Sequence, residues 1–150
     1  MTSRSIRGRV GARRCAVQAL YQWQITETPP ATIIAEFHSD RELNKVDLEY
    51  FDTLVRTIPR EADSLRAHIE PLLDRQWQAL GPVERSILLV GTYELVHCLE
   101  VPRKVVINEA VELARMFGAD EGHKYINGVL DKLSHDVRAI EWQADSKASG

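Results

Sequence analysis

The sequence has no long apolar run, no sign of a secretory signal and little cysteine. Even Ser86–Val96 is interrupted by Ser, Gly, Thr, Tyr and Glu, so no stretch of about 18 apolar residues is available to span a membrane. The N-terminus carries arginines where a secretory signal would carry an apolar run. Cys15 and Cys98 are too few for a disulfide framework and favour a reducing compartment. We therefore expect a cytoplasmic protein without a membrane partner.

Patterns that support catalysis or cofactor binding are also missing. The five histidines form no H-x-x-x-H pair and the cysteines form no C-x-x-C unit, which argues against a zinc site. Phosphate-binding loops of the G-x-x-x-x-G-K-[ST] and G-x-G-x-x-G types do not occur. Glu109 and Glu112 share a helix face, but such pairs are more often solvated than catalytic. We expect a binding protein that is not an enzyme and has no metal or cofactor.

Acidic residues are absent from residues 1–26, which gives this segment a charge of +5. The net charge of −3 therefore leaves −8 for the other 124 residues. A basic head on an acidic protein is expected to attract a polyanion at one end only. A solvated tail that aids solubility is an alternative of about equal weight. The arginines of this head are Arg4, Arg7, Arg9, Arg13 and Arg14.

Apolar residues recur with helical spacing from Gly11 onward, and no period-2 alternation between hairpin turns is present. Pro29–Pro30 should end the first helix, and Asp47 and Asp120 can cap later ones. The stretch 83–96 is apolar around most of its circumference and is expected to be buried. The pattern predicts an all-α fold of about seven helices, with a seam at Gln76–Pro82.

These features give a provisional division of the chain. We expect a flexible basic arm over residues 1–10, a single helical domain over 11–142 with sub-bundles at about 11–75 and 82–140, and a frayed tail over 143–150.

Two segments combine cations with aromatic rings. Arg13, Val17 and Tyr21 are spaced by four residues, so an arginine and a tyrosine share one helix face, with Gln18 nearby. Guanidinium groups and aromatic rings together are typical of single-stranded RNA binding. From the residues alone, a half-buried core position for Tyr21 is slightly favoured. Near the other end, residues 122–128 place Lys124, Tyr125 and an amide at a helix start, where free N–H groups suit a phosphate; close helix packing is the alternative there.

Four segments resemble the NusB family of transcription antitermination factors: ARRCAVQALYQWQIT (12–26), VERSILLVGTYEL (83–95), VPRKVVINEAVELARMFG (101–118) and HKYINGVLDKL (123–133). The resemblance covers nearly the whole chain in the family's order. It implies two small helical bundles packed roughly perpendicular to each other. It also implies binding to single-stranded boxA leader RNA together with NusE, a small-subunit ribosomal protein, and action on rRNA transcription by RNA polymerase with NusA and NusG.

The resemblance assigns roles residue by residue. The RNA-binding positions it implies, together with those that the residue pattern favours, are Arg7, Arg9, Arg13, Arg14, Gln18, Tyr21, Lys124 and Tyr125, and the NusE-facing positions are Glu84 and Gln78. Two departures from the family pattern affect the detail: Val10–Gly11 interrupts the arginine cluster, and Glu121 and Gly122 precede the HKY motif.

Two other functions remain open at this stage. The same fold occurs as the RNA-binding domain of certain rRNA cytosine methyltransferases, so the chain could be an rRNA-binding module that works with a methyltransferase. A homodimer is the other possibility, because the apolar helices could form a self-complementary face that covers the RNA surface.

Overall fold

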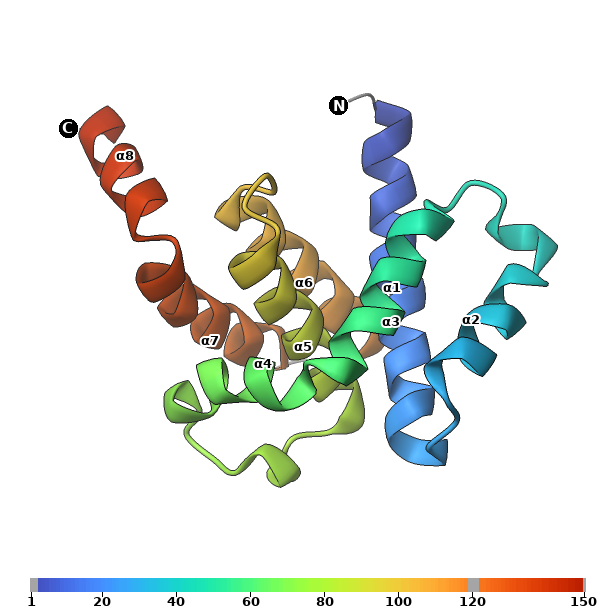
Figure 1. Ribbon diagram of the computed structural model, residues 1–150. Coiled ribbons are helices and arrows are strands. Elements are labelled where there is room, and N and C mark those ends of the chain that lie inside the picture. Colours follow the sequence, from blue (N-terminus) through green and yellow to red (C-terminus); the bar gives the residue numbers. More distant parts are fainter. Residues whose placement is uncertain (1–2, 119–121, 150) are drawn as a thin grey trace. The chain divides into compact units, whose positions relative to one another are not determined.

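The computed structural model describes residues 3–118 and 122–149, and these residues form eight α-helices, three short 3-10 helices and no strand (Figure 1). The predicted all-α class is confirmed, with one more α-helix than the approximate number expected. None of the helices in the described part of the chain is both long and apolar enough to cross a membrane. The α-helices are α1 (Ser3–Thr26), α2 (Pro30–His38), α3 (Leu48–Arg60), α4 (Ala62–Ile69), α5 (Pro82–His97), α6 (Arg103–Phe117), α7 (Gly122–Val137) and α8 (Ala139–Ser149). The 3-10 helices are η1 (Arg41–Leu43), η2 (Glu70–Leu72) and η3 (Trp77–Ala79).

The chain divides into two compact units, Met1–Asp63 and Ser64–Gly150. The sequence pattern placed the seam later, at Gln76–Pro82. The difference arises because η2 packs against α7, which assigns it to the second unit. Helix α4 begins in the first unit and continues into the second.

Three helices build the first unit. Helix α1 packs along α3, and α2 packs against both (Figure 1). The core side chains share complete or nearly complete burial, and they include Ala16, Leu20, Ile33, Phe51, Leu54, Val55 and Ile58. Asp47 caps α3 as predicted, because its carboxylate accepts a hydrogen bond from the Tyr50 N–H at 3.0 Å.

Helix α1 begins earlier than the periodicity indicated. Residues 3–10 form its first turns, where the sequence predicted a flexible arm. The apolar stripe begins only at Ala12, so periodicity could not detect these turns. These turns pack against the rest of the unit through Gly8 and Gly11. Glycine has no apolar side chain, so an apolar pattern in the sequence cannot reveal this packing.

The second unit has α5 at its centre, in contact with α6 and α7. Ten consecutive residues of α5, from Ser86 to Leu95, are buried, as the circumferential apolar pattern predicted. Gly118 ends α6 as expected, whereas the predicted cap Asp120 and Glu121 lie outside the described residues. Helix α8 packs on α7, so the segment expected as a frayed tail is helical as far as Ser149.

Candidate nucleic-acid interface

The four α1 arginines to which the family resemblance gives an RNA role differ in solvent exposure. Arg7 is exposed, Arg9 and Arg14 are partly exposed, and Arg13 is 4% exposed. The structure differs from the prediction at Arg13, because a side chain with so little accessible surface cannot present its charge to a phosphate. The other three arginines keep accessible surface on the first unit.

Tyr50, in the first turn of α3, explains where two of these arginines lie. The Arg9 guanidinium lies 4.4 Å from the centre of the Tyr50 ring and the Arg13 guanidinium 5.8 Å from it. Both distances are within the range of cation–π attraction. Arg9, Asp47, Glu49, Tyr50 and Thr53 line one hollow of about 270 Å³. Arg9 therefore lies against an aromatic ring and shares a hollow with two acidic residues.

The middle of α1 presents the predicted amide and ring. Gln18 is exposed and Tyr21 is 42% exposed, so Tyr21 is not the half-buried core residue that the sequence slightly favoured. Val17, one turn earlier on the same face, is 2% exposed and belongs to the core. Tyr21 can therefore offer ring surface to an unpaired base.

Lys124 and Tyr125 lie in the first turn of α7 in the second unit, with Lys124 exposed and Tyr125 partly buried. The Arg75 guanidinium lies 4.3 Å from the centre of the Tyr125 ring. The Asp74 N–H donates to the Tyr125 hydroxyl oxygen at 3.3 Å. One face of the ring is thus occupied by Arg75, so a base would stack on the opposite face or on the guanidinium itself.

Charge links this tyrosine to the predicted partner-binding residue Glu84. The hydrogen bond from Arg75 lowers the pKa of Asp74, and the Tyr125 hydroxyl contributes in the same direction. Desolvation raises the pKa of Tyr125. Asp74 raises the pKa of Arg75, with a smaller contribution from the charge of Glu84. We call Asp74, Arg75, Glu84 and Tyr125 the Arg75 cluster.

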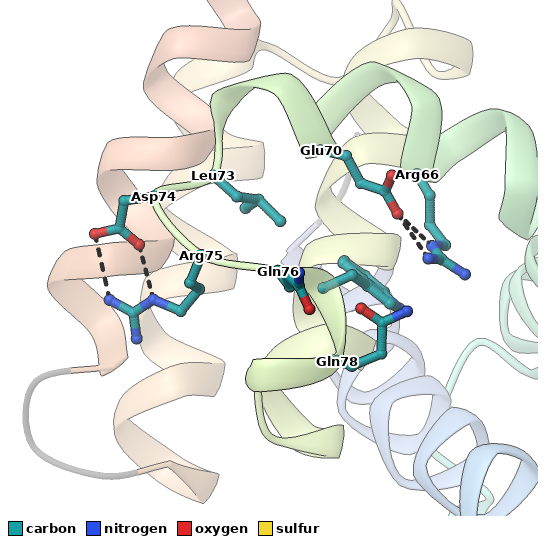
Figure 2. A pocket seen from close by; sticks show the side chains of 8 residues that line it. Arg66, Glu70, Leu73, Asp74, Arg75, Gln76 and Gln78 are labelled. Carbon is teal, nitrogen blue, oxygen red and sulfur yellow. Dashed lines mark hydrogen bonds and ion pairs between the residues drawn. The ribbon is translucent and has the colours of Figure 1, made fainter.

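Gln78 belongs to the rim of a hollow next to this cluster. Figure 2 shows this hollow of about 480 Å³, in which the Arg75–Asp74 and Arg66–Glu70 ion pairs form two charged sides. Trp77, which also lines the hollow, is 8% exposed and lies beneath the Arg66 guanidinium. Glu84 is partly exposed in the first turn of α5, and Gly122 lies beside its carboxylate. The hollow is polar, which suits contact with a macromolecule better than binding of an apolar small molecule.

The structure therefore brings together some of the predicted site residues and separates others. Arg7, Arg9, Arg14, Gln18 and Tyr21 share helix α1 of the first unit. Lys124, Tyr125, Glu84 and Gln78 belong to the second unit, where the Arg75 guanidinium lies against the Tyr125 ring. Sequence reasoning missed Tyr50 and Arg75. Tyr50 meets Arg9 and Arg13, and Arg75 meets the Tyr125 ring, across more than 35 residues of chain, and no local spacing signals such contacts.

No group of three or more histidine, cysteine or acidic side chains that could hold a metal ion occurs in the part of the chain that the structure describes. Cys15 and Cys98 are free thiols buried in the core, and burial raises the pKa of Cys15 against the opposing charge of Arg14.

Comparison with known proteins identifies the family. Residues 11–135 match the NusB family. The chain is 52% identical over 130 residues to the transcription antitermination protein NusB of Ralstonia nicotianae, covering 87% of this chain and 84% of that protein. It is 44% identical over 147 residues to the protein of the same name from Legionella pneumophila (strain Corby), covering 98% of this chain and all of the relative. Among solved structures, T. maritima NusB is similar in fold, with a TM-score of 0.78 at 24% identity, covering 95% of this chain and 98% of that one. The chain belongs to the NusB family of transcription antitermination proteins.

Proposed function

We propose that this protein is a non-enzymatic, RNA-binding antitermination factor of the cytoplasm. In this proposal it binds boxA-type leader RNA together with NusE and promotes processive rRNA transcription by RNA polymerase with NusA and NusG. The names of its relatives support the antitermination class over the methyltransferase alternative. The family resemblance supplies boxA and NusE.

The observation that carries the proposal is the charge of helix α1. Its 24 residues contain five arginines and no acid, so the helix carries a charge of +5 in a protein of net charge −3. Exposed Arg7, Gln18 and Tyr21 lie along it. If Arg7, Arg9 and Arg14 each neutralise one phosphate, log affinity should fall against log salt with a slope of roughly −2. A base stacked on Tyr21 would add about 1–3 kcal/mol.

So few phosphate contacts predict modest RNA affinity for the protein alone. A second protein that contacts both the RNA and the acidic side chain of Glu84 would raise the effective concentration of each binding surface for the other. We assign Glu84, which is partly exposed, and Gln78, which is exposed, to NusE. Such a ternary assembly explains how a weakly RNA-binding protein could act selectively on one leader sequence.

Substitution of Arg7 tests the RNA surface. Arg7→Gln should make the salt dependence of boxA RNA binding shallower by about 0.7 in the log–log slope, because one phosphate contact is lost. Filter binding across a series of salt concentrations measures this slope. Arg56→Gln is the matched control. Arg56 is exposed on α3, so its substitution removes the same charge from another helix. An unchanged slope in Arg7→Gln, or an equal change in both variants, would count against the α1 surface.

A further inference from the structure

The first turns of α1 are attached to the start of α3 by backbone contacts. The Gly8 carbonyl oxygen accepts a hydrogen bond from the Asp47 N–H at 3.0 Å. A Cβ at Gly8 would lie 3.4 Å from Asp47 Cβ, and one at Gly11 would lie 3.0 Å from Val46 Cγ2. Two glycines thus allow the helix to approach the chain around Val46 and Asp47 more closely than larger residues would permit.

Side chains fasten the same turns at a second point. Tyr50 is 8% exposed and its ring carries Arg9 at 4.4 Å and Arg13 at 5.8 Å. Two guanidinium groups near one ring repel each other, and the carboxylates of Asp47 and Glu49 beside Arg9 offset this repulsion. The backbone of Tyr50 lies in the capped first turn of α3, because its N–H donates to the Asp47 carboxylate.

This attachment matters because the first turns of α1 are unfavourable as an isolated helix end. They hold arginines and no acid in the first turn, and positive charge at a helix N-terminus opposes the helix dipole. Without a tertiary contact these turns should fray, and RNA binding would then have to order them at an entropic cost.

We infer that Tyr50 is a positioning residue for RNA binding, which holds the arginine-bearing turns of α1 helical before RNA arrives. The inference rests on the proposed function and deepens it. Arg13 is a support in this arrangement and does not contact phosphate. Arg9 has two roles, because its guanidinium rests on the Tyr50 ring while the side chain keeps some accessible surface that can face a phosphate.

Tyr50→Leu and Tyr50→Phe, compared with the wild-type protein, test the inference. Tyr50→Leu removes the ring and should weaken binding of a single-stranded boxA oligonucleotide about three- to tenfold, and it should abolish amide-exchange protection over residues 7–12. Tyr50→Phe keeps the ring and should restore both properties. If Tyr50 had a purely structural role, Tyr50→Leu would lower the melting temperature of the protein, but RNA affinity would not fall together with the amide-exchange protection of these turns.

Gly11→Leu provides an independent route if Tyr50→Leu does not fold. It pushes the turns away from Val46 without altering a charge or Tyr50, so it should produce the same paired loss of protection and affinity. The inference is overturned if either variant loses protection but binds the oligonucleotide as tightly as the wild type, or more tightly. A wild-type protein that does not bind the oligonucleotide contradicts the proposed function instead, whatever the exchange data show.

Discussion

Arg138 is 4% exposed and closes the C-terminal end of helix α5. Its guanidinium donates to the carbonyl oxygens of Leu95 at 2.8 Å, Cys98 at 3.0 Å and Glu94 at 3.1 Å. It also pairs with Glu141. The Glu94 and Cys98 carbonyls also accept from the N–H groups of Cys98 and Val101. Arg138 therefore adds a second donor at these two carbonyls and supplies a donor to the Leu95 carbonyl near the helix end. Burial therefore distinguishes Arg138, a structural residue, from Arg7, an exposed one.

Arg138→Met should destabilise the protein by about 3 kcal/mol, because the Leu95 carbonyl loses its side-chain donor and the Glu141 carboxylate loses its ion pair with a buried guanidinium. Arg115→Met is the control: Arg115 pairs with Glu112 across an exposed helix face, and its loss should cost at most about 0.5 kcal/mol. Urea denaturation followed by circular dichroism measures both. Equal stabilities for the two variants would show that the buried hydrogen bonds contribute little.

Among the elements, α8 owes its order to a cluster around Trp142. The Arg103 guanidinium lies 3.5 Å from the ring centre, and the indole N–H donates to Ser134 Oγ at 3.1 Å. The His135 ring of α7 stacks on the Trp142 ring of α8, with 3.8 Å between the ring centroids. Arg103 also pairs with Asp145 at 2.5 Å. These contacts join a polar segment to α6 and α7, and polarity alone had suggested fraying.

Helix packing between α5 and α7 depends on Gly91. A Cβ there would lie 2.8 Å from Leu130 Cδ1, in a fully buried contact. Gly91→Ala should therefore lose about 1 kcal/mol of stability, since overpacking exceeds the gain in helix propensity. Gly128→Ala in α7 is the matched variant: a Cβ there meets no atom within 4 Å outside the helix's own backbone, so it should gain about 0.5–1 kcal/mol. The denaturant midpoints of the two variants show whether each substitution stabilises or destabilises the protein. A Gly91→Ala protein that is more stable than the wild type would contradict the close contact.

The sequence could predict elements whose causes are local. Proline at Pro29–Pro30 and Pro82, the Asp47 cap and the apolar circumference of α5 each act over a few residues, and each feature is present in the structure. The start of α1 and the order of α8 depend on contacts distant in sequence, so no local pattern indicated them. The same holds for the candidate site. Residue type and family position selected Arg7, Tyr21 and Tyr125, whereas the burial of Arg13 follows from Tyr50, on another helix.

At the scale of the whole molecule, the two compact units carry different surfaces, and the second unit also holds two of the predicted RNA-binding residues, Lys124 and Tyr125. The first unit carries the basic helix, and the second carries the Arg75 cluster with Glu84. Each surface alone is small and polar, which predicts weak binding of either ligand. In the proposed function, RNA and NusE together supply the affinity.

Filter binding of a boxA oligonucleotide and a scrambled one, with and without NusE, tests this account most directly. Modest preference for boxA should become strong when NusE is added, and Glu84→Lys should abolish the increase while leaving the weak binding of RNA alone. Equal retention of both oligonucleotides in the presence of NusE, or full NusE enhancement in Glu84→Lys, would contradict it.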